Sequence, residues 1–402
     1  MRLLIPTVAL CATVSVAASA SAQQTRLTRA DAVRTALTRG TRVAVAAADT
    51  AVAAAQVVAA RVFPDPSFTA SYSKAVPTQH YSFDVPLEGP WLRRPRSQSA
   101  AFTLQAARVK FILARATVGL DADTTYTRAI AAREHLALSR RNALDGDSLL
   151  HMVERRRAAG DASDMDVELA RVNAGQQQNT AAGDSLTWIS TLLDLQATLG
   201  YLSDDLEITA VDSLEMPPDA RPPAQATLSE TAASLSLTAA ALNSQAHRHS
   251  VFSAPTLSFG FEHGDPDQPG ILPTFGLGLS LPIFNRQRGE ILVAEAERIK
   301  AQAELAQAQV EARNEIAHGK RERENALAKV ARDRQLIASA DRVASMSLVA
   351  YREGAASLPN VLEAQRSARD IRGQYIDDLA AAWIATAELR VLSLTPTSQL
   401  LP

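Results

Sequence analysis

The sequence predicts a mainly α-helical protein with a smaller β contribution, built from two copies of one unit: β-hairpin, long helix, turn, long helix. A strand-like run closes at Phe83-Asp84-Val85-Pro86-Leu87, and a second closes at Leu279-Ser280-Leu281-Pro282-Ile283-Phe284. Each is followed, at almost the same distance, by a long Ala-rich segment that ends in a turn, at Gly160-Asp161-Ala162-Ser163 and at Gly354-Ala355-Ala356-Ser357. An internal repeat of this length describes an architecture rather than a local motif.

The composition favours long, closely packed helices over thick globular cores. Hydrophobic residues make up 47% of the chain but aromatic residues only 5%, so that alanine supplies much of the apolar count. Alanine buries little area per residue and lets helix backbones approach each other, which suits helical bundles and coiled coils. The formal net charge of -2 gives no nucleic-acid footprint.

Residues 1–22 predict a signal peptide. Arg2 provides a positive start, residues 3–16 are mostly apolar, and Ala20-Ser21-Ala22 has the small-x-small form of a cleavage site. The apolar core is too short to span a membrane. The single cysteine, Cys11, lies inside this segment, so we expect the exported chain to have neither a disulfide nor a reactive thiol.

Residues 23–200 form the first predicted repeat. It begins with a helix over about 26–61, and a β-hairpin follows at about 66–88, where apolar residues alternate with small polar ones. A pair of long helices then covers about 96–199, with two weak points at Gly119 and Gly146.

The second predicted repeat, 227–394, has the same order. A Pro-rich linker at 201–226 precedes it. The repeat then contains a helix, a β-hairpin at about 255–284 and a long helix pair at about 286–394. The tail at 395–402 carries no signal that we can interpret.

Both hairpins concentrate aromatic residues on one face, as a lipid-facing surface requires. A soluble β-sandwich face is the alternative, but four strands so far apart in sequence make a poor sandwich. No segment after the signal peptide is apolar enough to predict a transmembrane helix. Four strands are too few to close a barrel, so we expect several chains to contribute strands to one barrel.

The long helix predicted from Arg286 to Arg352 carries small and aliphatic residues at three- and four-residue steps, a pattern typical of a coiled coil. We interpret its opposite, charged face as solvated. In each turn a helix-ending glycine precedes an N-cap serine, which predicts two antiparallel helical hairpins.

In their order and spacing, several segments make the chain resemble the TolC-like outer-membrane efflux proteins. The resemblance covers nearly the whole chain after the signal peptide and rests on four segments: Leu27-Thr28-Arg29-Ala30-Asp31-Ala32-Val33, Pro64-Asp65-Pro66-Ser67, Leu281 through Arg288, and Tyr351 through Gln365. A fifth, Val85-Pro86-Leu87-Glu88-Gly89, is similar to the heavy-metal-efflux branch of that family.

The resemblance implies a passive exit duct of a tripartite efflux pump or a type I secretion system, in the cell outer membrane and extending into the periplasm. Four strands per chain from a homotrimer would complete a 12-stranded barrel in outer-membrane lipid, continuous with a periplasmic α-helical barrel. The implied partners are a periplasmic adaptor (membrane fusion) protein and an inner-membrane efflux transporter.

The resemblance also implies where the site lies. The two turns would dock the adaptor, with Gly160, Ser163, Gly354 and Ser357 as the residues concerned. Candidate acids for a ring at the periplasmic aperture are Asp164, Asp166 and Glu363. The alternative reading is that such acids only favour the dipole at a helix N-terminus, and we weigh the two equally.

No catalytic constellation is present in the sequence. It has no Gly-rich phosphate loop, and no serine has a histidine and an aspartate at recognisable spacing. We interpret His247 and His249, and the acidic loop at 262–267, as surface residues, and therefore expect no enzyme activity, cofactor or metal site. The competing function is a soluble periplasmic adaptor or coiled-coil scaffold, which has no reason to build a lipid-facing hairpin twice.

Overall fold

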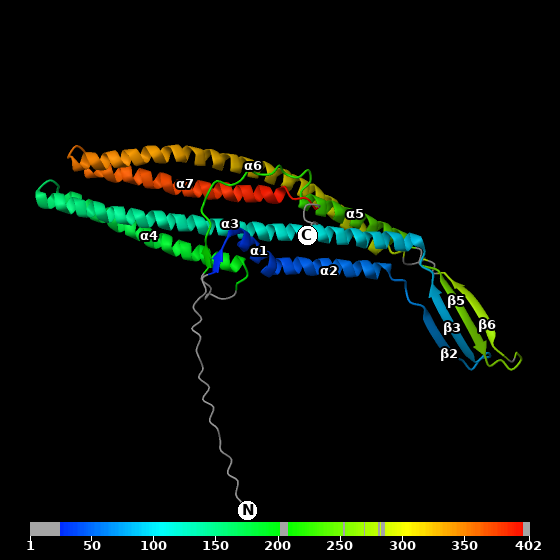
Figure 1. The fold of residues 1–402 in the computed structure, drawn as a ribbon. Coiled ribbons are helices and arrows are strands. Elements are labelled where there is room, and N and C mark those ends of the chain that lie inside the picture. The colour runs from blue at the N-terminus through cyan, green and yellow to red at the C-terminus, as the bar shows by residue number, and fades with distance from the viewer. Residues whose placement is uncertain are drawn as a thin grey trace, which may run out of the picture.

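The computed structural model describes residues 25–201, 208–251, 254–268, 270–279, 282 and 286–396 (Figure 1). The predicted signal peptide lies outside these residues. The elements, in chain order, are β1 (Thr25–Leu27), α1 (Arg29–Arg39), α2 (Thr41–Arg61), β2 (Ser67–Tyr72), β3 (Gln79–Pro86), α3 (Pro90–Ala159), α4 (Asp164–Thr198), β4 (Ile208–Ala210), α5 (Leu228–His249), β5 (Thr256–His263), β6 (Leu272–Gly278), α6 (Arg288–Arg352) and α7 (Leu358–Leu392).

The predicted duplication is present as two helical hairpins, α3 with α4 and α6 with α7. At 1.5 Å per residue, the 70 residues of α3 and the 65 of α6 make helices about 100 Å long. Helix α3 begins at Pro90, before the predicted start, because a proline at the first helical position is tolerated there. It also runs unbroken through Gly146, where an added Cβ would lie 3.3 Å from the Cα of Ala174. That glycine is therefore a close-packing position between α3 and α4 rather than a weak point.

The single N-terminal helix predicted over 26–61 is wrong. The chain forms the short strand β1, then α1, and the helix breaks at Gly40, whose backbone is extended (φ -63°, ψ 118°). Strand β1 pairs in parallel with β4, from beyond the first helical hairpin. Thr28 caps α1 by accepting a hydrogen bond from the backbone N–H of Asp31.

The four remaining strands form one open antiparallel sheet in the order β2-β3-β5-β6. Its register places the apolar side chains of the two hairpins on one face, for example Phe68 opposite Phe83 and Phe259 opposite Phe275. Ring pairs lie along this face: Tyr81 and Phe261 have ring centres 4.7 Å apart. The other face is small and polar, with Ser82 opposite Gly260. Strands β2 and β6 have no neighbour on their outer edges among the described residues.

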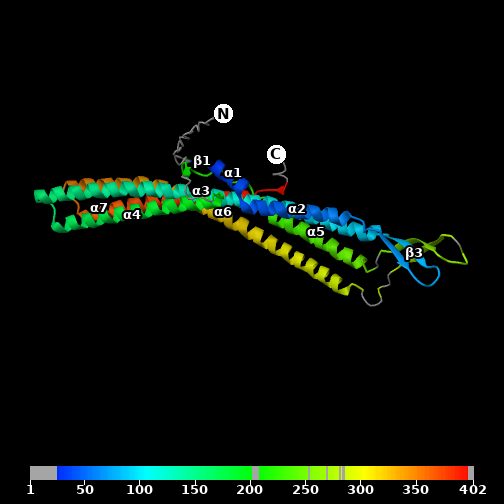
Figure 2. The ribbon, with the colours of Figure 1, turned by 90° about the horizontal axis from the view of Figure 1, so that it is seen from below.

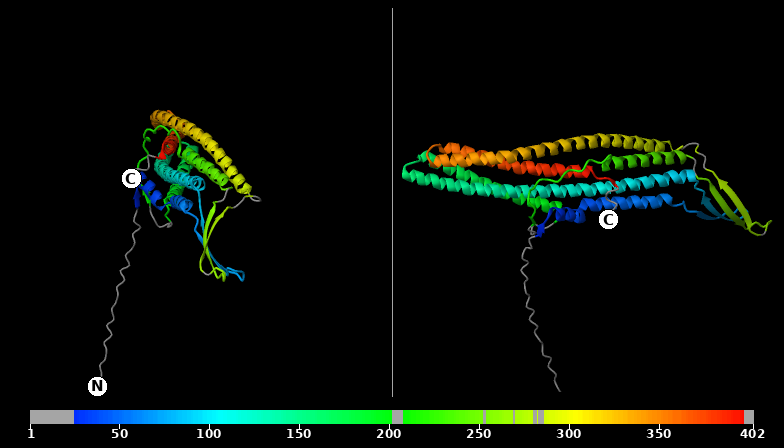
Figure 3. Two further views of the ribbon diagram at one scale, coloured as in Figure 1. Left: turned by 90° about the vertical axis from the view of Figure 1, so that its right-hand side faces the viewer. Right: turned by 45° about the horizontal axis from the view of Figure 1, so that its top comes forward.

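The helices above the sheet repeat its order as one curved layer, α2-α3-α5-α6 (Figures 2 and 3). Each helix of this layer contacts the next, so α2 and α6 lie at its two edges, just as β2 and β6 do in the sheet. Beyond the middle of α3, the layer gives way to the two helical hairpins, whose turns lie at the end of the molecule opposite the sheet (Figure 1).

The buried side chains form separate clusters along the molecule rather than one core. The largest lies at mid-height, where Tyr126 and Ile130 of α3 pack with Leu195 of α4 and with the β1–β4 strand pair. A second cluster lies near the turns. The buried residues of α6 are mostly small, as the predicted seam requires: Ala294, Ala301, Ala312, Gly319, Ala326, Val330, Asp333 and Tyr351. The part of α6 nearer the turn lies against α7, since Gly319 meets Leu389 close to the end of α7, and the earlier part lies along α5.

The expectation that no segment after the signal peptide could cross a membrane as a helix is corrected by α2. By length and composition Thr41–Arg61 is apolar enough to do so, because it consists mostly of alanine and valine. In the structure, however, it packs alongside α3 as the edge of the helical layer. Its apolar outer face is therefore a property of that edge.

Candidate functional site

The two predicted turns lie together at one end of the molecule (Figure 1). In the first, Gly160 has a left-handed backbone (φ 86°), and the N–H of Asp161 reaches back to the carbonyl of Arg156 at 2.8 Å. In the second, Gly354 is also left-handed (φ 71°), and the N–H of Ala355 donates to Ala350 at 2.8 Å. Glycine is needed in both places because side chains with a Cβ rarely adopt such a conformation.

The two serines differ although they hold equivalent positions. Ser163 forms a full capping box: its hydroxyl accepts from the N–H of Asp166, and the Asp166 carboxylate accepts from the N–H of Ser163 at 3.0 Å. Ser357 stands at the N-cap of α7 with extended backbone but makes no side-chain capping bond. The prediction that both serines cap their helices by side chain is therefore right for Ser163 and wrong for Ser357. A proline at the start of α7 supplies a preset backbone angle there instead.

A contact between Arg156 of α3 and Tyr351 of α6 joins the two helical hairpins just above their turns. The Arg156 guanidinium donates to the backbone carbonyl of Tyr351 and lies 4.6 Å from the centre of its ring. The Tyr351 ring is buried (5% exposed) beside Leu149, Val153 and Leu358. Its hydroxyl is enclosed without a hydrogen-bond partner, and burial raises the pKa of this phenol.

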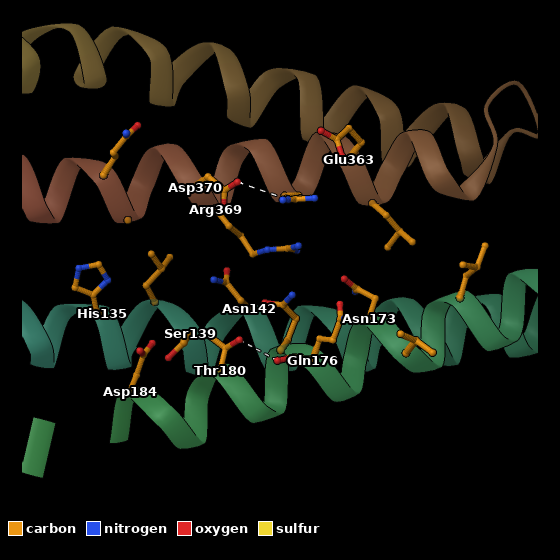
Figure 4. Close-up of a pocket in the computed structure, with 18 of the residues that line it drawn as sticks. His135, Ser139, Asn142, Asn173, Gln176, Thr180, Asp184, Glu363, Arg369 and Asp370 are labelled. Carbon is orange, nitrogen blue, oxygen red and sulfur yellow. Dashed lines mark hydrogen bonds and ion pairs between the residues drawn. The ribbon is translucent and has the colours of Figure 1, made fainter. Parts of the chain in front are cut away.

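The candidate acids occupy different surroundings. Asp164 pairs with Arg157 at 2.5 Å, and that hydrogen bond lowers the pKa of Asp164. Asp166 is engaged in the capping box. Glu363 lies one turn into α7 and lines a groove instead of a turn (Figure 4). The three acids therefore do not gather into one cluster within a single chain.

The groove separates the two helical hairpins and was not predicted from the sequence. It has a volume of about 980 Å³ and is walled by α3 and α4 on one side and by α7 on the other (Figure 4). The α3–α4 wall carries uncharged amide and hydroxyl groups, including Asn142, Asn173, Gln176 and Thr180. The α7 wall is charged, with Glu363, Arg366, Arg369 and Asp370.

Two side chains of this groove are poorly solvated. The Asn173 amide nitrogen is buried with no hydrogen-bond partner. Burial also lowers the pKa of the Arg369 guanidinium, which lies between the walls in Figure 4. The half-buried Arg369 guanidinium remains within reach of an incoming polar surface, whereas the Asn173 nitrogen is covered within the chain. At the end of the groove away from the turns, His135 of α3 bridges to Asp377 of α7 at 2.8 Å.

Farther from the turns, a mid-height junction fastens the N-terminal segment to both hairpins; it consists of Arg29, Asp123, Tyr126, Trp383 and Arg390. The Arg29 guanidinium pairs with Asp123, donates to Thr127 at 2.7 Å and stacks 4.0 Å from the Trp383 ring. Arg390 of α7 approaches the other oxygen of Asp123 at 3.6 Å.

The strand pair beside Arg29 is held by a second set of bonds. The Tyr126 hydroxyl lies 2.8 Å from the carbonyl of Leu27 and 3.0 Å from Asp212. Burial raises the pKa of Tyr126 from 10 to about 12, so this phenol remains a hydrogen-bond donor well above neutral pH. Arg133 donates to the carbonyls of Ala210 and Asp212 at 2.6 and 2.8 Å. Within one chain, α3 and α7 are thus joined firmly at the junction and by fewer polar contacts below it.

The charged face of α6 departs from its prediction in two places. Glu295 accepts from Arg298 and Ser244, and those hydrogen bonds lower the pKa of Glu295 to about 2. Arg323 is mostly covered and reaches Thr386 of α7 at 3.1 Å. The described residues contain no group of three or more His, Cys, Asp or Glu side chains placed to hold a metal ion.

Comparison with known proteins supplies three findings. Residues 225–393 match the family described as outer membrane efflux protein. None of the curated proteins compared matches the chain.

The third finding is the fold. It is similar to a membrane protein from Pseudomonas aeruginosa (20% identity, 91% of this chain and 93% of that one, TM-score 0.77). It is also similar to the outer membrane protein VceC from Vibrio cholerae (19%, 91% and 96%, 0.77). The Campylobacter jejuni CmeC outer membrane channel matches as well (15%, 100% and 97%, 0.76). At these identities the structural likenesses establish the fold.

Proposed function

We propose that this chain is an outer-membrane efflux channel of the TolC-like type, and that three copies form one passive duct, fed at its periplasmic end through an adaptor by an inner-membrane transporter. The match of residues 225–393 to the outer membrane efflux protein family supports this proposal. The observation that carries the proposal is the matching order of the sheet and the helical layer, β2-β3-β5-β6 and α2-α3-α5-α6. Both end in free edges on the same two sides of the chain.

The edges support assembly into a ring. A strand edge in lipid leaves backbone N–H and C=O groups unpaired, so β6 of one copy needs β2 of the next. The helical edges also expose apolar side chains: Val45, Val52 and Val58 on α2, and Leu292, Val293, Ile299 and Val310 on α6. Different surfaces that meet head to tail generate closed rings. Three copies of four strands give a barrel of ordinary size.

The two faces of the sheet support its placement in the membrane. The aromatic face is exposed in a single chain, with Phe275 at 77% and Tyr72 at 73%. Such a face suits lipid, whereas the Ser, Thr and Gly side of the sheet suits a water-filled lumen. A soluble adaptor would have to leave this aromatic face in water, which disfavours the scaffold alternative.

The turns and the groove between the helical hairpins support docking of the partner at the other end. Turn backbone around Gly160 is open, with nothing within 4 Å of an added Cβ. The groove adds a charged wall and an amide wall just above the turns. We propose Gly160, Ser163, Gly354 and Ser357 as the docking positions and Glu363 as the aperture acid. Asp164 and Asp166, which have local partners, are the weaker candidates.

The assembly is tested by disulfide cross-linking between copies. The predicted mature chain has no cysteine, so Val58→Cys on α2 and Leu292→Cys on α6, both close to the hairpin end of their helices, introduce the only thiols. Oxidation of the double variant in membranes should yield a covalent trimer, whereas each single variant should not. A soluble periplasmic monomer would falsify the channel proposal.

Docking is tested separately by Gly354→Trp. We expect trimers and outer-membrane location to persist while efflux is lost, because the tryptophan strains the backbone of the turn and adds a bulky side chain where the partner approaches. The control is Gly183→Trp, at an exposed helical glycine farther from the turns, where an added Cβ would meet nothing within 4 Å. Loss of trimer, or undiminished efflux, would count against a docking role. The cargo is identified by measuring which compounds accumulate in cells that lack this protein, and accumulation of heavy-metal ions would support the heavy-metal prediction.

A further inference from the structure

A buried acid interrupts the small-residue seam between α6 and α7. The other buried residues of α6 are alanine, glycine, valine and tyrosine, but Asp333 stands among them at 7% exposure. Its Oδ2 is enclosed and has no hydrogen-bond partner. Since this oxygen is already covered within one chain, no neighbouring copy or partner can reach it with a cation.

A second carboxyl group faces this acid from α7. Asp378 lies within hydrogen-bonding reach of Asp333, and its own side chain is only 16% exposed. The nearby cations are Lys329, whose Nζ lies 3.3 Å from Asp378, and Arg332. Burial first, and then Asp378, raises the pKa of Asp333, and the two cations do not cancel that shift.

We propose that Asp333 and Asp378 form a proton-binding site inside the α6–α7 hairpin, in which one proton taken from solvent is held between the two carboxyl groups. With the proton on Asp333, its O–H donates to the Asp378 carboxylate, and Asp378 also accepts from Lys329. Releasing the proton leaves two adjacent carboxylates in a desolvated seam, with Lys329 bonded to Asp378 and Arg332 nearby.

The consequence is a helical hairpin whose stability depends on pH. Because the folded pKa of Asp333 is above its unfolded value, the folded state binds more protons than the unfolded chain. The stabilisation from the bound proton is complete below the unfolded pKa and is lost as pH rises through the folded pKa. At this level α6 and α7 are otherwise joined by polar contacts such as Arg334 with Tyr375 and Arg372 with Asp341. Alkalinisation should therefore loosen the hairpin here first.

The first test is spectroscopic and independent of transport. Infrared spectra of the purified assembly, labelled with carbon-13 aspartate, should show a protonated carboxyl band that persists above the ordinary aspartate pKa of 3.8. Asp333→Asn, which keeps the shape and is permanently neutral, should remove that band. The exposed-acid control Asp370→Asn should leave the band unchanged. An unchanged band in Asp333→Asn would overturn the proposal.

The second test is the pH profile of thermal unfolding, followed by helical circular dichroism. The midpoint of the natural protein should fall relative to Asp333→Asn as pH rises from the ordinary aspartate pKa of 3.8 through the raised pKa of Asp333. Asp378→Asn should flatten the profile as well, because it removes the neighbouring charge. Parallel profiles for the natural protein and both variants would refute the shared proton. Neither readout depends on the channel function.

Discussion

The guanidinium of Arg156 lies 4.6 Å from the centre of the Tyr351 ring, and with this contact the end of α3 grips the end of α6. The two residues are far apart in the sequence and belong to different copies of the repeat. Their contact joins the hairpins at the turns, while the mid-height junction joins them near the middle of α3. The groove with its desolvated amide and guanidinium groups lies between these two ties.

Arg156→Ala should loosen the turns without preventing assembly. The variant removes a charged hydrogen bond, worth about 1.5–3 kcal/mol, and a cation–π contact, worth about 0.5–1 kcal/mol at an exposed site. We expect a higher frequency of channel opening in planar bilayers and unchanged trimer recovery. Arg155→Ala, one residue away on the exposed side of α3, is the control. Equal opening frequencies in the two variants would show that this contact does not restrain the turns.

Tyr351→Phe should be neutral or stabilising. The Tyr351 hydroxyl is buried without a partner, and an unsatisfied buried polar group costs about 1–3 kcal/mol. Phenylalanine keeps the ring beneath Arg156 and removes only that hydroxyl. Thermal denaturation of the trimer measures the effect. A clear loss of stability would reveal that the hydroxyl has a bonding role in the assembled protein.

Gly160→Ala should lower the stability of the protein, whereas Gly175→Ala should raise it. Neither added Cβ meets another atom within 4 Å, so packing is not involved. At Gly160 (φ 86°) alanine is forced into a left-handed backbone, which costs about 1 kcal/mol. Gly175 lies inside α4, where alanine gains about 1 kcal/mol over glycine. Denaturation midpoints of the two variants compare these backbone effects directly.

Arg29→Leu should be among the most destabilising single changes. Removing one partner of a buried ion pair typically costs about 3–5 kcal/mol, and Asp123 would keep only the more distant Arg390. The exposed Arg34→Ala on the same helix should cost little. Urea unfolding followed by helical circular dichroism separates the two variants. Similar midpoints for both would mean that the junction is not a structural tie.

Glu295 gives a prediction for acid stability. Its hydrogen bonds to Arg298 and Ser244 lower its pKa to about 2, below the ordinary value of 4.5. Its stabilising contribution is therefore present above the unfolded pKa and is lost as pH falls through the folded value. Glu295→Gln should lower the unfolding midpoint at neutral pH, and the difference from the natural protein should vanish as pH approaches about 2. A pH-independent difference would contradict the bonds to Glu295.

Local patterns predicted the duplicated elements, but not the contacts between them. The hairpins and both long helix pairs were readable because alternation and seam periodicity are properties of neighbouring residues. The break at Gly40 was missed because helix-forming residues flank it on both sides. Strands β1 and β4 were missed because each has only three residues, and their pairing joins distant parts of the chain.

Prediction of the site from the sequence is limited in the same way, because its contacts join distant parts of the chain. The left-handed glycines of the turns follow from sequence, since helix-ending glycines have a recognisable setting. Arg29 lies in the segment Leu27 to Val33, which carries part of the family resemblance. Its structural role, however, depends on Asp123 and Trp383, which come from two other helices. The groove was equally unpredictable. The amide-rich run from Gln176 to Thr180 is a sequence signal, but only the facing α7 makes it a groove wall.

The opposite edges of the helical layer have a genetic consequence. A subunit with a mutation that disrupts the α2 edge still has an intact α6 edge. It can therefore bind a neighbouring subunit through α6, but the ring that contains it cannot close. If altered and natural subunits mix at random in equal amounts, roughly one ring in eight of the proposed trimers contains natural subunits alone, and every other ring has at least one interface that cannot form. Mutations on this edge should therefore behave as dominant, whereas mutations that prevent the chain from folding should be recessive.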